Sequence, residues 1–164
     1  DFISARDVET PFQETPADTQ ILQDTSNYRV FDIERFLQAR TSYFHKSIGG
    51  YSAVKPKRIQ QLFDYQIVKN NLEILNMLNV KYAIKMDKDG NDVVIGNPDA
   101  NGNAWFVSKI KGVQNPDQEM KALNNFKSKE EAVINENEFK RARFDLCYLC
   151  IVWIFEFFLY WYSD

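Results

Sequence analysis

The stretch that most constrains the fold is residues 80–97, VKYAIKMDKDGNDVVIGN. Its two arms, VKYAIKM and DVVIGN, are rich in residues that favour strands. Between them, DKDGND supplies residues that favour turns. The pattern therefore predicts a β-hairpin, and with it at least one antiparallel pair of strands.

Three further segments have the composition of strands. Residues 28–33, YRVFDI, alternate apolar and polar side chains, which predicts a half-buried strand. Residues 104–113, AWFVSKIKGV, and residues 130–135, EEAVIN, are the other two. The chain is thus expected to contain a small mixed or antiparallel sheet.

Helix starts separate these strands. Thr15, followed by Pro16, Ala17 and Asp18, predicts a capped helix that ends near residue 23. Asn115-Pro116 with Gln118 predicts a second one that ends near residue 126. Apolar residues at helical spacing after Pro56 predict two consecutive helices, or one that is interrupted at Asn70-Asn71. With three to four short helices among the strands, we expect an α+β fold.

The last 26 residues do not fit this pattern. We expect residues 1–138 to form one domain and residues 139–164 to be a separate apolar tail. Residues 144–162 are almost unbroken apolar sequence of membrane-spanning length. Asp145 and Glu156 argue against a membrane span but do not exclude it, so three alternatives stay open for the tail: a membrane span, a packed core segment, and altered sequence.

Charge and cysteine content exclude several classes of protein. Residues 1–143 hold as many acidic as basic side chains, so the chain lacks the positive charge of a nucleic-acid-binding protein. Cys147 and Cys150 lie in an apolar segment with one histidine in the whole chain, which is typical of buried apolar cysteines and not of a redox pair or zinc site. We expect no metal and no cofactor. The N-terminus carries no signal peptide, which favours either a cytoplasmic protein or a piece excised from a larger one.

The segment TSYFHKSIGGYSAVKPKR, residues 41–58, is predicted to be a loop and is the richest in chemical groups. His45 is the only imidazole of the chain, and Ser42 and Ser47 are close to it in sequence. A hydrolase could use such a pair, but sequence proximity does not establish a hydrogen bond between them. The alternative is a histidine that bonds the loop backbone.

The same loop could bind a ligand. Lysines and an arginine alternate here with aromatic rings, a combination that suits an anionic sugar or phosphate. The alternative is a solvated surface with a glycine turn. The candidate ligand-binding residues are Tyr43, His45, Lys46, Gly49, Gly50, Tyr51, Lys55 and Arg58. The aspartates of DKDGND resemble a calcium loop only faintly, because the final glutamate of that pattern is absent.

Four blocks together suggest a family: TPADTQILQDTSNYRVFD, RTSYFHKSIGGYSAVKPKR, LEILNMLNVKYAI, and NPDANGNAWFV followed by a helix and EEAVIN. In order and spacing they resemble the extracytoplasmic C-terminal region of YfhO-type bacterial integral membrane proteins, over residues 1–138. The residues that match the blocks are Tyr43, His45, Lys46, Gly49, Gly50, Tyr51, Asn76, Asn79, Lys81, Asn103 and Trp105. The tail from residue 139 does not match.

The resemblance implies a polytopic parent protein of the glycosyltransferase type, which acts on envelope glycans such as lipoteichoic acid. The catalytic acid of such an enzyme is expected in its membrane-proximal part, which these blocks do not include. This chain would then be a non-catalytic domain outside the cell membrane that binds or positions the acceptor. Its partners would be the membrane-embedded part of the parent and an anionic glycan or lipid-linked sugar, with no nucleic acid. The alternatives are a small hydrolase that uses His45 and a purely structural envelope domain.

Overall fold

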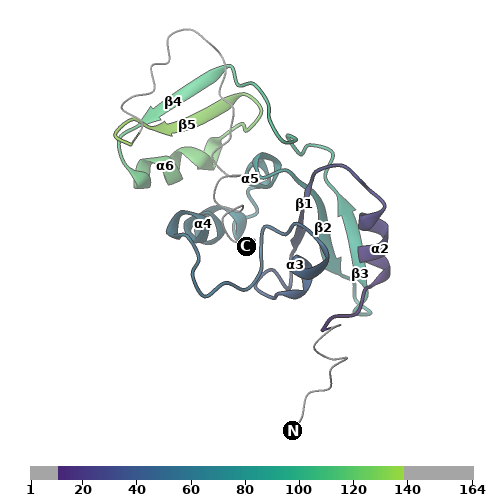
Figure 1. Ribbon diagram of the computed structural model, residues 1–164. Coiled ribbons are helices and arrows are strands. Elements are labelled where there is room, and N and C mark those ends of the chain that lie inside the picture. The colour runs from purple at the N-terminus through teal and green to yellow at the C-terminus, as the bar shows by residue number, and fades with distance from the viewer. Residues whose placement is uncertain (1–10, 139–164) are drawn as a thin grey trace. The chain divides into compact units, whose positions relative to one another are not determined.

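The structure is a computed structural model that describes residues 11–138. It shows an α+β fold, as the sequence predicts, with a mixed three-stranded sheet and a separate two-stranded sheet (Figure 1). The predicted tail and both cysteines lie outside the described residues. The described chain forms two compact units, residues 11–53 with 80–99 and residues 54–79 with 100–138.

The first unit is built on the sheet β1-β2-β3. Strand β1 (Arg29–Asp32) pairs in parallel with β2 (Val80–Met86), and β2 pairs antiparallel with β3 (Asp92–Gly96). The predicted hairpin is confirmed: the Asp87 N–H donates to Asn91 O at 2.9 Å, and Asp87 Oδ1 accepts from the backbone N–H groups of Asp89 and Asn91. Because β1 and β2 are parallel, a long connection has to join them, and residues 33–79 make it.

Two helices of this unit pack against the sheet. Helix α2 (Pro16–Leu22) contacts β3, and α3 (Arg40–Phe44) contacts β1. The Thr15 cap is confirmed in full, because the Thr15 hydroxyl accepts from the Asp18 N–H and the Asp18 carboxylate accepts from the Thr15 N–H. Helix α3 corrects the prediction that residues 41–58 are all loop. The core consists of Ile21, Val30 and Ile84, against which Tyr28, Tyr82 and Val94 pack.

Strand β1 is more buried than its sequence suggests. The predicted strand is confirmed as β1, but Val30, Phe31 and Asp32 are all buried, so the prediction that only one of its faces is buried is wrong. The polar Asp32 side chain gives the strand its alternating pattern, yet it is only 1% exposed. Its burial is tolerated because the carboxylate accepts three hydrogen bonds, which are described below.

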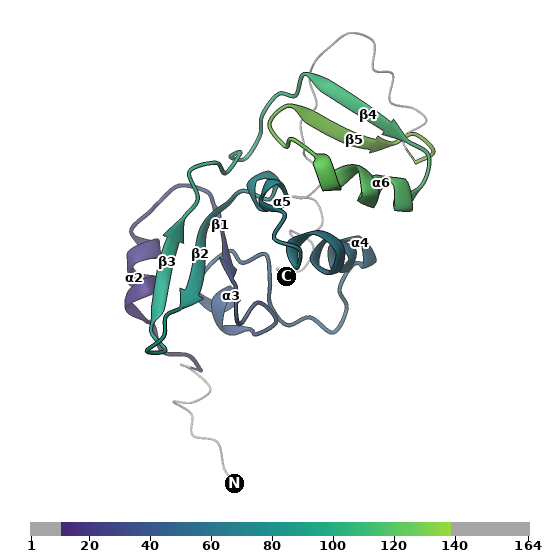
Figure 2. The same cartoon turned by 180° about the vertical axis from the view of Figure 1, so that it is seen from behind.

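The second unit contains a β-α-β arrangement. Strand β4 (Lys109–Val113) pairs in parallel with β5 (Glu131–Asn135), and α6 (Pro116–Ala122) with the 3-10 turn η2 (Leu123–Asn125) connects them. Figure 2 shows α6 lying along the two strands. The Asn115 cap is confirmed, since its side chain accepts from the Gln118 N–H at 2.9 Å. The predicted strand 104–113 is shorter than expected, because only its second half pairs with a neighbour.

The remaining helices of this unit follow the predicted interruption. Helix α4 (Lys57–Leu62) continues as the π-helix η1 (Phe63–Ile67), and α5 (Leu72–Met77) begins after the two asparagines. Asn70 and Asn79 have φ angles of 59° and 57°. Asparagine is one of the few residues besides glycine that adopts this left-handed conformation readily, which explains why the helices end there.

Candidate functional site

The candidate loop is fastened to the edge of the first unit's sheet. The Val30 N–H donates to Lys46 O at 2.9 Å, and the Ile48 N–H donates to Val30 O at 3.2 Å, so residues 46–48 lie alongside β1. The residues on either side of this short pairing are thereby held in place. The loop is therefore a fixed part of the sheet edge.

Two glycines allow the chain to turn away after this pairing. The Gly50 N–H donates to Phe36 O at 2.7 Å, and Gly50 has a φ of 114°, which side-chain-bearing residues rarely adopt. A Cβ atom on Gly49 would overlap the same Phe36 carbonyl oxygen. Backbone geometry thus accounts for both glycines without a ligand.

His45 lies inside the unit and its side chain is 1% exposed. Its Nε2 is 2.9 Å from Asp18 Oδ1, a fully buried carboxylate at the start of α2. Because a carboxylate only accepts, Nε2 carries the proton and, in the neutral ring, Nδ1 carries the lone pair. Nδ1 has no hydrogen-bond partner among the described residues. This position gives the imidazole a structural role.

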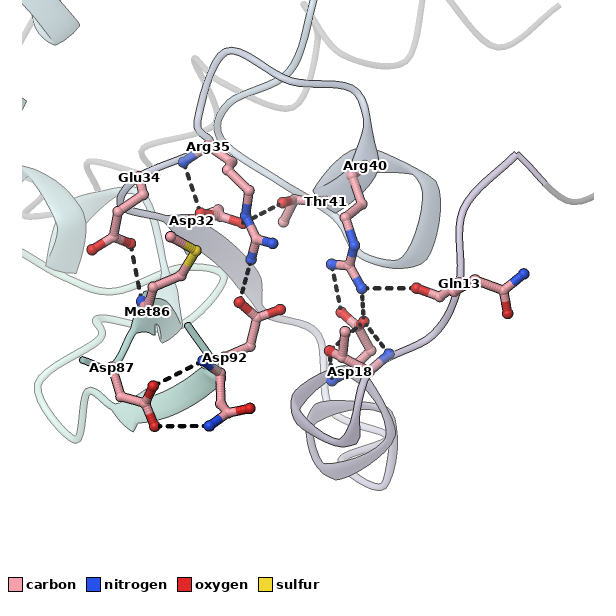
Figure 3. Close-up of polar contacts among 12 residues, drawn as sticks. Gln13, Asp18, Asp32, Glu34, Arg35, Arg40, Thr41, Met86, Asp87 and Asp92 are labelled. Atoms are coloured by element: carbon pink, nitrogen blue, oxygen red, sulfur yellow. Dashed lines mark hydrogen bonds and ion pairs between the residues drawn. The ribbon is translucent and has the colours of Figure 1, made fainter. Parts of the chain in front are cut away.

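Asp18 is the centre of a buried polar network that joins α2 to α3 (Figure 3). Besides His45, it accepts hydrogen bonds from Arg40 and from the Thr15 hydroxyl, and Arg40 also donates to Gln13 O at 3.0 Å. Burial alone would raise the pKa of the Asp18 carboxyl, but the hydrogen bonds from Arg40, Thr15 and His45 outweigh it and lower the pKa from 3.8 to about 2. Asp18 is therefore charged at neutral pH and holds the start of α2 against both ends of α3.

Neither candidate serine is bonded to His45. Ser47 Oγ accepts from the Gly49 N–H at 3.0 Å, and Ser42 is exposed with its Oγ beside Gly50. Of the two imidazole nitrogens of His45, Nε2 bonds Asp18, and Nδ1 has no hydrogen-bond partner among the described residues. The arrangement offers no support for a serine hydrolase.

A second buried network, which the sequence gives no reason to expect, lies at the end of β1. Asp32 accepts from the Arg35 side chain at 3.1 Å and from the Thr41 hydroxyl at 3.0 Å, while Arg35 also donates to Asp92 of β3 at 2.6 Å (Figure 3). Burial opposes the guanidinium charge, but the two carboxylates outweigh it and raise the pKa of Arg35. The network ties α3 to the sheet, so its role is again structural.

The side chains of α3 and of the loop after it that do face solvent include aromatic and basic ones. Tyr43 is 50% exposed, with its ring edge-on to the rings of Phe12 and Phe44, and Tyr51 is 80% exposed. Lys46 is exposed and donates to the side chain of Asn27 at 2.9 Å. The partner of Lys46 is thus a neutral amide, which leaves its positive charge uncompensated by that contact.

The last two candidate residues belong to the second unit. Lys55 lies over the ring of Phe63, with Nζ 5.2 Å from the ring centroid. Arg58 forms an ion pair with Glu138 and a longer one, at 3.7 Å, with Glu119. Within this unit, the charge of Arg58 is therefore already met by two carboxylates.

Residues of the other matching blocks also have structural partners. Asn79 donates to Asn103 Oδ1 at 3.1 Å, and Trp105 Nε1 donates to Ser128 O at 2.7 Å. Lys81 donates to Asp24 Oδ2 at 2.5 Å and, together with Ser26 and Tyr82, lowers the pKa of that carboxyl. The contact with Asp24 in turn raises the pKa of Tyr82. These contacts join segments that are 23 to 58 residues apart in the chain.

Comparisons of the chain with models of protein families, with curated proteins and with solved structures found no match. Within residues 11–138, no helix is long and apolar enough to cross a membrane. In the same part of the chain, no group of three or more histidine, cysteine or acidic side chains is placed to hold a metal ion.

Proposed function

We propose that this chain is a non-catalytic domain outside the cell membrane, part of a YfhO-like membrane glycosyltransferase, and that it binds and positions an anionic glycan acceptor. Holding an acceptor in place contributes to rate without any proton transfer by the domain itself. The membrane-embedded part of the parent would carry the chemistry.

The observation that carries the proposal is how the loop distributes its side chains. The imidazole of His45 is buried against Asp18, whereas the ring of Tyr43 on α3 and the side chains of Lys46 and Tyr51 in the following loop face solvent. Exposed rings can stack on sugar faces, and an exposed cation attracts a phosphate or carboxylate. A loop that binds needs such groups, and the hydrogen bonds of Val30 and Phe36 supply the rigidity.

The resemblance to YfhO-type proteins supports the assignment to an envelope glycan. Tyr43, Lys46 and Tyr51 all lie in the block that resembles the family most closely. The proposed binding surface is therefore defined by these three residues of the first unit.

The test is binding of the full chain to purified lipoteichoic acid, with dextran as a neutral polymer of comparison. Tyr43→Ala, Lys46→Ala and Tyr51→Ala together should weaken binding to lipoteichoic acid at least about tenfold, since one lost ring contact alone is worth about 1 kcal/mol. Tyr65→Ala is the matched control, because Tyr65 is 51% exposed in the second unit. Lys46→Ala alone should weaken binding to lipoteichoic acid, and this loss of affinity should become smaller as salt is added, because salt screens the charge of Lys46.

Two results would contradict the proposal. Equal binding by the wild type and the triple variant would remove the loop as the site. No binding by the folded wild type to either polymer would favour the structural alternative.

A further inference from the structure

The chain contains one asparagine that is followed directly by a glycine, Asn101-Gly102. Contacts within the second unit fasten the residues on both sides of Gly102. The Asn101 N–H donates to Asn76 O at 3.0 Å, and Asn103 Oδ1 accepts from Asn79 Nδ2 at 3.1 Å. Gly102 lies between these contacts with a φ of 85°, a conformation that favours glycine. The pair is therefore held in a defined backbone conformation.

An asparagine before a glycine can modify itself. The backbone nitrogen of the glycine attacks the side-chain amide carbon of the asparagine, and the new C–N bond closes a succinimide ring. The former amide nitrogen takes up the proton of the glycine N–H and leaves as ammonia. Water then adds to either carbonyl of the ring and opens it, which yields aspartate or isoaspartate without any oxidant or reductant. Glycine favours the attack because it has no Cβ beside the nucleophile.

The two groups that would react are both free of hydrogen bonds within residues 11–138. In this range the Gly102 N–H donates to no acceptor, and Asn101 Nδ2 is buried without a partner. The nucleophile and the leaving group can therefore react without first breaking a contact of the fold. The surroundings of Gly102 are open as well, since a Cβ there would meet no atom within 4 Å.

Asp89-Gly90 in the hairpin turn shows the opposite arrangement. Aspartate before glycine can close the same ring, with loss of water in place of ammonia. Here, however, the Gly90 N–H donates to Asp87 O at 3.2 Å, and Asp87 Oδ1 accepts from the Asp89 N–H at 2.9 Å. The turn has to open before the nitrogen can attack, which adds the free energy of local unfolding to the barrier. The hydrogen bonds thus single out Asn101-Gly102 of the two pairs.

The product would add a charge beside an existing one. Asn101 Oδ1 is 3.5 Å from Ser128 Oγ, and the hydroxyl and N–H of Ser128 both donate to Glu73 Oε2 at 2.8 Å. A carboxylate at residue 101 would therefore share Ser128 with the carboxylate of Glu73. Because Ser128 is fully buried, water would screen the repulsion between the two like charges only weakly. Isoaspartate would also lengthen the backbone between the contacts to Asn76 and Asn79.

We propose that Asn101-Gly102 is a site of spontaneous modification, at which Asn101 converts through a succinimide to aspartate and isoaspartate in the folded protein, and that this conversion loosens the second unit. The chemistry needs water and no enzyme. Because the ammonia is lost, the change accumulates with the age of each molecule. The proposal does not depend on glycan binding by the first unit.

Peptide mapping of the full chain tests the reaction. One sample is kept native at pH 8 and another is kept unfolded in guanidinium chloride at the same pH. Trypsin then releases residues 89–109, in which fragmentation locates any replacement of an amino group by a hydroxyl. In the native sample Asn101 should convert before the other asparagines of this peptide. Its rate should be less than about tenfold below the unfolded rate, because no hydrogen bond has to open.

Two results of this mapping would overturn the proposal. The first is conversion of Asn91, Asn97 or Asn103 before Asn101 in the native sample. The second is a native rate at Asn101 more than about tenfold below the unfolded rate, which would mean that the fold protects the pair.

Asn101→Asp reproduces one product and tests its effect on the second unit. Asn103→Asp is the matched control, because it adds the same charge nearby and keeps an oxygen that can accept from Asn79. Hydrogen exchange of a peptide that covers residues 109–113, measured over a urea series, reports on unfolding of this unit. Asn101→Asp should lower the midpoint by about 0.5 M or more relative to Asn103→Asp. Equal midpoints would show that conversion leaves the unit intact, and this part of the proposal would be wrong.

Discussion

Acidification should loosen the first unit through one carboxyl group, that of Asp18. Its pKa is 3.8 in an unfolded chain and about 2 in the folded protein, a lowering due to Arg40, Thr15 and His45. Because the folded pKa is the lower one, the stabilisation is complete above about pH 4 and is lost as the pH falls through about 2. At 1.36 kcal/mol per pKa unit, this group contributes about 2 kcal/mol to the free energy of unfolding at neutral pH.

The perturbation is Asp18→Asn, compared with wild type at a series of pH values from 6 to 2. The variant should be less stable than wild type at pH 6, and the difference should shrink toward pH 2, where the wild-type carboxyl is itself being protonated. With a urea dependence of about 2 kcal/mol per molar, the Asp18 contribution corresponds to about 1 M in the unfolding midpoint. Glu14→Gln is the control for loss of one negative charge, since Glu14 is an exposed neighbour that contacts Thr19.

The assay has to report on the first unit. Trp105, the tryptophan within the described residues, lies in the second unit, so its fluorescence does not follow the network. Hydrogen exchange of a peptide that covers residues 28–33, measured over a urea series, reports on unfolding of the first unit. A difference between Asp18→Asn and wild type that stays constant from pH 6 to pH 2 would show that the Asp18 carboxyl is not the group that titrates.

Two further substitutions test the packing of each unit. Gly49→Ala should destabilise the first unit by about 1–3 kcal/mol, because its methyl group meets the Phe36 carbonyl oxygen. Gly96→Ala is the control and should not destabilise the unit in this way, since its Cβ meets no atom within 4 Å. Thermal unfolding of both variants checks this difference. In the second unit, Gln66→Leu should cost about 1–3 kcal/mol, since the buried Gln66 amide donates to Met120 O and accepts from Asn71 Nδ2, and both partners lose this hydrogen bond when it is removed. Fluorescence in urea, in a background with Trp153→Phe and Trp161→Phe so that Trp105 is the only emitting tryptophan, measures this loss, and an unchanged midpoint would mean that the amide contacts contribute nothing.

Local sequence signals predicted most elements of the fold, because those elements depend on neighbouring residues. The Thr15 and Asn115 caps lie within three residues of the N–H groups that they satisfy. The turn between β2 and β3 is likewise closed by Asp87 within its own six residues. Strand β4 was predicted too long at its start, since its first residue is set by where the parallel partner β5 begins, which the local pattern does not contain.

The candidate site was predicted less well, because it depends on contacts between distant segments. His45 is a plausible base or ligand in the sequence, but its partner Asp18 precedes it by 27 residues. The apparent cation cluster is also divided, as Lys46 lies in one unit and Lys55 and Arg58 in the other. Asp18 could have been noticed as the acid of a capping box, yet nothing local indicated that the same carboxylate would also bind Arg40 and His45.

By itself, the sequence determined the helix starts, the hairpin, the interruption at Asn70-Asn71 and the α+β class, because hydrogen bonding and backbone preference over a few residues decide these features. Three other features depend on contacts across the fold: His45 is buried while Tyr43 and Tyr51 are exposed, Asp32 lies inside a network with Arg35, and β3 is an edge strand of its sheet. Burial and pairing of this kind depend on which distant segments meet, and the free energy of a buried charge depends on partners that the local sequence does not contain.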